Sequence, residues 1–192
     1  MSQRVGEIIG ADSRVLTVQC YELYGAPPLG TFLSVGEPPV LAIVQCIRTE
    51  PLDPSRPVLA RGRDFDTLDD IYRENPQLER LLTTRLDALI VGYESDGRLV
   101  QLLPPVPPAI HAFVSICPPA TVARFTDNLE FTRFLLNSGS PMADEVMVAC
   151  LRTVSSNRSE GDEFLRRAGQ ILSKEMVGDS ARLSSILRRA RL

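Results

Sequence analysis

The chain has 192 residues, of which 44% are hydrophobic and 23% charged; this excludes wholesale disorder and allows one domain with a smaller second one. No stretch reaches the roughly 18 uninterrupted apolar residues of a membrane helix, and the N-terminal segment lacks the apolar core of a signal peptide. We therefore expect a cytoplasmic protein without membrane contact. The net charge of −3 is divided unevenly, because residues 1–149 sum to −7 and residues 150–192 to +4.

The first half of the chain has the pattern of short β-strands. Arg4–Ala11 and Val15–Tyr21 are rich in Val, Ile, Leu and Thr and are separated by a few polar residues, which predicts two strands and a tight turn. Thr31–Val35 is a further candidate strand. Val40–Arg48 is almost continuously apolar, as expected of a strand that is buried on both faces or bent within a closed barrel.

Prolines between positions 51 and 57 end this run, and helical signals follow them. Thr67 with Asp70 three residues later resembles a capping box, which marks the start of a helix. Asn75 and Pro76 predict the start of a second helix, with asparagine as the N-cap and proline at the first helical position. We interpret the region near residues 67–86 as a helical insertion between strands.

The strongest hairpin signal comes after this insertion. Asp87–Glu94 and Arg98–Leu103 flank Ser95-Asp96-Gly97, and Asp-Gly between two apolar runs favours a type I′ turn. Six prolines lie between positions 104 and 119; because proline has no N–H to donate, only His111–Cys117 between them is a candidate strand. About six strands favour a small closed β-barrel over an open sheet, since closure removes exposed edges.

The last third of the chain is helical. Apolar residues at helical spacing predict helices over 127–136, after Ser140-Pro141, after Ser159 or Glu160, and after Gly178, where Asp179 is the expected N-cap. The expected fold class is therefore α+β. A barrel with its helical insertion occupies residues 1–125, and a C-terminal helical bundle occupies residues 126–192.

Most catalytic chemistries lack the residues that they need. Lys174 is the only lysine and has no GxxxxGK loop around it, which excludes a P-loop ATPase and disfavours Schiff-base chemistry. His111 is the only histidine and lies close to two prolines, so we interpret it as a structural residue that bonds to a loop carbonyl. We expect a protein that is not an enzyme, with no catalytic residue and no cofactor.

The candidates for metal binding also have simpler explanations. The densest acidic cluster consists of Asp64, Asp66, Asp69 and Asp70, and an enzyme that uses it to bind a divalent metal is a third, less favoured hypothesis. Asp69 and Asp70 are explained without a metal, because carboxylates in the first turn of a helix are stabilised by the helix dipole. The cysteines form no CxxC pair and each lies in an apolar run, which predicts buried thiols rather than zinc ligands. They are Cys20, Cys46, Cys117 and Cys150.

Nearly all the basic residues are arginines, and four of them lie near the C-terminus: Arg182, Arg188, Arg189 and Arg191. A solvated helix face accounts for them, because basic residues near a helix C-terminus complement its dipole. Two functional interpretations stand beside this one. The arginines are candidates for contact with the acidic surface of a protein partner or with the phosphates of a nucleic acid, although interleaved aromatic residues are missing.

Three apolar motifs carry a family resemblance. VGEIIG (residues 5–10), LGTFL (29–33) and Val40–Cys46 together resemble the HAS-barrel, the small β-barrel at the N-terminus of HerA-type DNA translocases, which is related to the N-terminal barrel of F-type ATP synthase subunits. LLPPVPPAIHAF (102–113) is similar to the Pro-Pro stretch by which such translocases leave the barrel. The resemblance spans residues 4–118. It implies a barrel used for subunit and partner contacts in a ring assembly, and helices stand where the translocases have their ATPase domain.

These inferences predict a non-catalytic interaction or assembly module of the HAS-barrel type. Its barrel or its helical tail is expected to dock a protein partner, for which a ring ATPase or a DNA-processing complex is the natural candidate. The alternative is a nucleic-acid-binding accessory protein that uses the Arg-rich C-terminal helix. An oligomer is compatible with both hypotheses.

Overall fold

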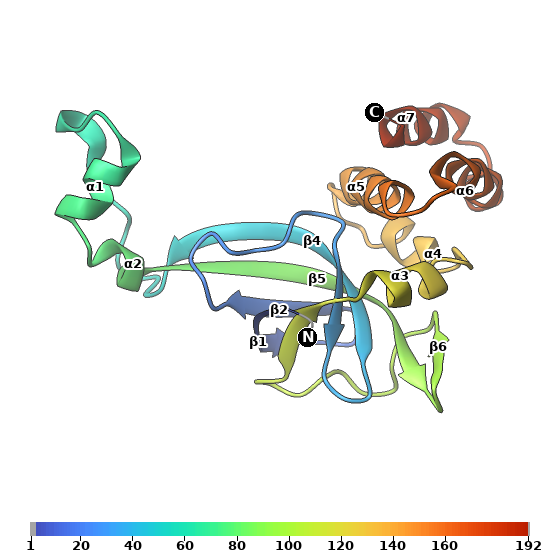
Figure 1. Ribbon diagram of the computed structural model, residues 1–192, viewed down its shortest axis with the longest axis horizontal. Helices are drawn as coiled ribbons and strands as arrows, with labels where there is room; N and C mark the ends of the chain where they lie inside the picture. Colours follow the sequence, from blue (N-terminus) through green and yellow to red (C-terminus); the bar gives the residue numbers. More distant parts are fainter. Residues whose placement is uncertain (1–2, 192) are drawn as a thin grey trace.

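The computed structural model describes residues 3–191 and contains an antiparallel sheet rolled into an almost closed ring, followed by helices (Figure 1). Its strands are β1 (Arg4–Ala11), β2 (Val15–Cys20), β3 (Phe32–Val35), β4 (Val40–Pro51), β5 (Leu82–Ser95), β6 (Arg98–Val100) and β7 (Phe113–Ile116). The order around the ring is β2–β1–β7–β3–β4–β5, and β5 pairs back with β2. β6 pairs only with β5 and lies outside the ring. The predicted α+β class with a small six-stranded near-barrel is confirmed.

Local turn chemistry explains the first hairpin. Asp12 Oδ1 accepts hydrogen bonds from the backbone N–H groups of Arg14 and Val15, each at 2.7 Å. Aspartate favours such turns because its short side chain bonds to the backbone just ahead of it. β2 then runs antiparallel to β1 and, along its other edge, to β5, where Val18 lies opposite Leu86. This second pairing brings the ring close to closure.

The first half of the central strand β4, residues 40–44, is buried on both faces, which explains its continuous apolar sequence. Ala42 and Val44 belong to the core inside the ring, whereas Leu41 and Ile43 belong to a second core between the sheet and the helices. Beyond Val44 a bulge interrupts the pairing of β4 with β5. The predicted burial on both faces is therefore confirmed for residues 40–44 and is wrong for residues 45–48, which are partly or fully exposed.

The expected hairpin and the strand between the prolines are also present. Asp96 and Gly97 have φ angles of 50° and 73°, as a type I′ turn between β5 and β6 requires. β7 occupies the middle of the predicted segment and lies between β1 and β3, where Val114 is paired with Gly6 on one side and Val35 on the other. Within the described residues the proline-rich flanks of β7 carry no strand, as predicted.

Beyond the ring, β4 and β5 continue as a two-stranded ribbon that carries residues 52–81 away from the barrel (Figure 1). We call residues 52–81 the arm. It contains a short 3-10 turn (Gly62–Asp64), α1 (Leu68–Glu74) and α2 (Leu78–Leu81). The predicted cap of α1 is confirmed, because Thr67 Oγ1 accepts a hydrogen bond from the Asp70 N–H at 3.2 Å.

Two details of the predicted insertion are wrong. Asn75 does not cap the second helix; its side chain instead donates to the Ile71 carbonyl at 3.0 Å and ends α1. The strand β5 begins at Leu82, so residues 82–86, which were expected in the helical insertion, are extended. They are extended because they pair with the outer half of β4, a partner that local periodicity does not reveal.

The C-terminal region contains α3 (Pro119–Phe125), α4 (Thr132–Leu136), α5 (Ala143–Ser156), α6 (Gly161–Glu175) and α7 (Ser180–Ala190). Three of the predicted helices are confirmed as α5 to α7, and Asp179 Oδ1 caps α7 by accepting from the Arg182 N–H at 3.3 Å. The helix expected over 127–136 is wrong in its first half, since α4 begins only at Thr132. No helix within residues 3–191 is long and apolar enough to span a membrane.

The helices pack on the outer face of the ring. Phe32 of β3, Phe125 of α3 and Phe131 just before α4 form an aromatic cluster with ring centroids 5.6–6.0 Å apart. Gly30 lets α5 approach the sheet, because its φ is +78° and a Cβ there would lie 2.4 Å from the backbone nitrogen of Cys150. The near-barrel and the helices therefore share a continuous apolar interface.

Candidate functional site

The four predicted partner-binding arginines do not form one surface. Arg182 donates from Nε and Nη2 to the Asp144 carboxylate at 2.9 and 2.6 Å, and this acceptor raises the pKa of Arg182. Arg189 forms an ion pair with Glu145. Both acidic partners lie in the first turn of α5, so these two arginines attach α7 to its neighbour. Arg188 and Arg191 are exposed and form no ion pair within residues 3–191.

The structure separates the other candidate residues as well. Asp64, Asp66, Asp69 and Asp70 all lie on the arm, and no group of three metal-ligating side chains is found among the residues that the structure describes. Asp70 is occupied by Arg73 and by Thr67 Oγ1, which donates at 2.6 Å. The hydrogen bond from the Thr67 hydroxyl is the main reason why the pKa of Asp70 is lowered. The cluster is therefore not assembled as a metal site.

His111 does not bond to a loop carbonyl as expected. Its side chain is 78% exposed, and its Nδ1 lies 3.1 Å from Glu7 Oε2. The Tyr21 hydroxyl donates to the other oxygen of Glu7 at 2.8 Å, and this bond, followed by the one to His111, lowers the pKa of Glu7. The three side chains are a surface hydrogen-bond chain beside the β1–β7 pairing, with no nucleophile in it.

The prediction of four buried thiols is correct for three of them. Cys20, Cys117 and Cys150 are buried, and burial raises the pKa of Cys20 and of Cys117 to about 11. Cys46 is exposed, contrary to the prediction. The bulge between Val44 and Cys46 inserts one extra residue, which reverses the alternation of β4 and turns Cys46 to the surface.

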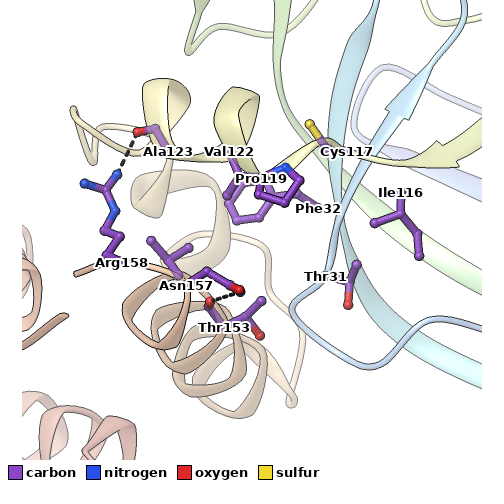
Figure 2. A pocket seen from close by; sticks show the side chains of 11 residues that line it. Thr31, Phe32, Ile116, Cys117, Pro119, Val122, Ala123, Thr153, Asn157 and Arg158 are labelled. Atoms are coloured by element: carbon purple, nitrogen blue, oxygen red, sulfur yellow. Dashed lines mark hydrogen bonds between the residues drawn. The ribbon is translucent and has the colours of Figure 1, made fainter. Parts of the chain in front are cut away.

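A small cavity of about 150 Å³ lies where α3 and α5 meet the sheet (Figure 2). Its walls are mainly apolar, from Phe32, Val122 and Val154. Two of the polar side chains beside it are bonded to backbone carbonyls: Asn157 donates to the Thr153 carbonyl at 2.7 Å, and Arg158 donates to the Ala123 carbonyl at 2.6 Å. We interpret this cavity as a packing gap between the two layers.

The arm is the most unusual part of the surface. None of its residues is buried, and the helices α1 and α2 bury no side chain. Large apolar side chains are instead exposed along it: Leu52, Val58, Leu59, Leu68 and Leu81, at 41–68% of their full accessibility. Elsewhere in the described chain each helix longer than one turn buries at least one apolar residue. The arm thus has secondary structure without a core.

Polar contacts hold the arm in place. The Leu52 N–H donates to the Leu81 carbonyl at 2.8 Å, which closes the base of the arm at the end of the ribbon. The Tyr72 hydroxyl of α1 lies 2.6 Å from that of Tyr24 in the loop between β2 and β3, and this hydrogen bond raises the pKa of Tyr72 to about 12. Arg61 donates to Asn75 Oδ1 at 3.1 Å across the arm. These bonds set its shape but bury little apolar surface.

A groove of about 360 Å³ lies at the base of the arm. Most of the residues that line it are apolar, and we call these the floor: Pro51, Leu52, Pro57, Val58, Leu59, Leu78, Leu81 and Leu82. Arg56, Arg61 and Arg80, which we call the rim, also line it, with Asp53 as the single acidic residue. This groove was not predicted from the sequence. Leu52, Val58 and Leu59 could have indicated it, because they are large apolar residues in a proline-rich segment that has neither helical nor strand periodicity.

Comparison with known proteins adds no assignment. No protein-family model matches the chain, and no curated protein matches it. The structure itself supports the coarser description, a near-ring of six antiparallel strands followed by helices.

Proposed function

We propose that this chain is a non-catalytic interaction module and that its arm docks a protein partner. The observation that carries the proposal is the arm itself, in which thirty residues hold a defined shape without one buried side chain. Ordering a residue costs about 1–2 kcal/mol of backbone entropy, and buried apolar surface normally offsets that cost. Exposed apolar side chains that gather in one place mark interaction surfaces. A partner that covers the arm would supply the missing burial.

The HAS-barrel resemblance supports an assembly role. The motifs VGEIIG and LGTFL fall on β1 and at the start of β3, and both strands belong to the ring. Barrels of this type serve subunit and partner contacts, so the resemblance directs the search for a partner toward a ring ATPase or a DNA-processing complex. Helices α3 to α7 stand where the translocases have their motor, and the proposal therefore includes no ATPase activity.

Nucleic-acid binding through the C-terminal helix has less support. Arg182 and Arg189 are paired with Asp144 and Glu145, which cancels half of the charge expected at the α7 surface. Only Arg188 and Arg191 of the four remain exposed without an ion pair in the described chain. Two positive charges are few for a phosphate-binding surface, because non-specific affinity grows with each neutralised phosphate.

The proposal is tested by quantitative affinity capture from native lysate. The tagged full chain is compared with an arm variant, L52S/V58S/L59S/L68S, and with a control variant, V106S/V177S, in which two apolar residues outside the arm that are even more exposed are changed. We expect the same set of proteins with the wild type and the control and a loss of them with the arm variant. Retrieval of the chain alone and as a monomer, or equal capture by the arm variant, contradicts the proposal.

A further inference from the structure

The groove at the base of the arm has the chemistry of a peptide-binding site. We propose that it takes a short peptide segment whose apolar side chains are flanked by acidic residues. This inference rests on the proposed docking role of the arm and specifies the partner's chemistry. Its two parts come from different features of the groove, the apolar floor and the basic rim.

The floor offers side-chain contacts rather than backbone pairing. Leu52 and Leu59 come from the segment that follows β4, and Leu81 comes from α2, so the floor is built from two stretches of chain. Pro51, the last residue of β4, has no N–H to donate, which disfavours extension of the ladder by a partner strand at that point. Apolar side chains of a bound segment would therefore enter the groove, in the way that helices and extended peptides use anchor residues.

The rim is basic although the arm as a whole is acidic. The arm contains seven acidic residues and five arginines. The groove, however, is lined by Arg56, Arg61 and Arg80 and by only one acid, Asp53, which forms an ion pair with Arg56 at 3.3 Å. Arg61 is bonded to a neutral amide, and Arg80 forms no ion pair within the described residues. Positive charge is thus concentrated where the apolar side chains are exposed.

The combination of apolar side chains and arginines in one groove favours some ligands over others. Charge complementarity favours acidic residues beside the apolar anchors and disfavours basic ones, because like charges on a shared rim repel. A second copy of the chain would have to present such an acidic and apolar segment in an accessible position. A partner that carries it on a flexible segment satisfies the geometry directly.

The test is fluorescence anisotropy with synthetic probes on the full chain. The first probe is a labelled 14-residue peptide of alternating leucine and glutamate pairs, and the second has lysine in place of every glutamate. At low salt we expect the wild type to bind the glutamate peptide at least tenfold more tightly than the lysine peptide, a ratio that falls as salt screens the rim. Hydrogen exchange should show protection of amides 52–81 by the glutamate peptide alone.

Two charge-reversal variants distinguish the effect of the groove arginines from the effect of the net charge of the whole chain. R56E/R61E/R80E changes the rim, whereas R63E/R98E/R124E makes the same change of net charge with exposed arginines that do not line the groove. We expect the first variant to reverse the peptide preference and the second to keep it. Circular dichroism confirms that both are folded, and since all six side chains are exposed, neither change removes a buried contact.

Several outcomes overturn the inference. They are a wild type that binds neither peptide or prefers lysine, an equal effect of the two charge-reversal variants, and a concentration-dependent dimer that L59S abolishes. The proposed function has a separate readout. If capture of proteins from lysate is lost in the apolar arm variant but unchanged in R56E/R61E/R80E, the docking role is supported and the acidic partner is excluded. If capture is unchanged in the apolar arm variant, the docking role itself is wrong.

Discussion

Removal of the arm should leave the rest of the fold intact. Glu50 and Thr83 are paired directly opposite each other on the ribbon, so replacing residues 51–82 with Asn-Gly would join them by a two-residue hairpin turn. The deleted segment contributes no buried side chain. The ring core, which includes Leu86 and Val44, lies on the barrel side of the junction and is untouched.

The expected change in stability follows from two opposed terms. Shortening a closed loop from about 30 residues to two removes roughly four doublings of length, which is worth about 2 kcal/mol in favour of the folded state. The hydroxyl contact between Tyr24 and Tyr72 is lost, which costs about 1 kcal/mol. The free energy of unfolding should therefore lie between about 1 kcal/mol below and 2 kcal/mol above that of the full chain.

Urea unfolding followed by circular dichroism measures this difference. The full chain and the deletion variant should unfold in single transitions, with a slightly smaller denaturant slope for the shorter chain because less surface becomes exposed. A loss of more than about 3 kcal/mol, or a variant without a cooperative transition, would contradict this expectation. It would mean that the arm is part of the folding core rather than a separate docking element.

Three further predictions concern other parts of the chain. Gln101→Ala should lower the free energy of unfolding by about 1–3 kcal/mol in urea titrations, since Gln101 Oε1 accepts from the Phe131 N–H at 2.6 Å and its loss leaves that group unpaired; an unchanged midpoint would contradict this. Of the four thiols only Cys46 should react rapidly with Ellman's reagent in the folded chain, and Cys46→Ser should remove the fast phase. Tyr24→Phe should lower the pKa of Tyr72 from about 12 toward 10, as measured by absorbance at alkaline pH. Because the folded-state pKa is the raised one, the stabilisation from this contact is complete below about pH 10 and is lost as the pH rises through about 12.

The strands of the near-barrel were predictable because their signals are local. The turn at Asp12 and the Asp96-Gly97 hairpin depend on side chains within a few residues, and the continuous apolar sequence of residues 40–44 in β4 indicates burial on both faces. The early start of β5 was not predictable in the same way. Residues 82–86 become a strand through pairing with residues 47–51, and a pattern within one segment contains no information about that partner.

Helix α3 and the orientation of Cys46 show two other limits. The prolines at 118 and 119 were used only to exclude a strand, but proline is also tolerated in the first turn of a helix, where its missing N–H has no partner to lose. Cys46 is exposed because of a single bulge, which shifts the alternation without a distinctive residue to announce it.

The candidate site was partly visible in the sequence. The basic character of α7 was evident, yet the acids of α5 that occupy Arg182 and Arg189 are 38 and 44 residues away and meet them only in the packed structure. The helical insertion was expected from the sequence, but the exposure of its apolar side chains was not. Whether an apolar side chain such as Leu59 is covered depends on what lies opposite, and at the end of the ribbon nothing in the described chain covers it.

Site-specific photo-crosslinking tests the docking role of the arm most directly. A benzophenone amino acid is placed in the full chain either at Leu59 on the arm or at Val177 between α6 and α7, two positions that are both highly exposed. After irradiation in native lysate, we expect discrete higher-mass adducts from position 59 and none from position 177. Adducts from position 177 alone, equal adducts from both, or none from position 59 would contradict the claim that the arm is where a partner binds.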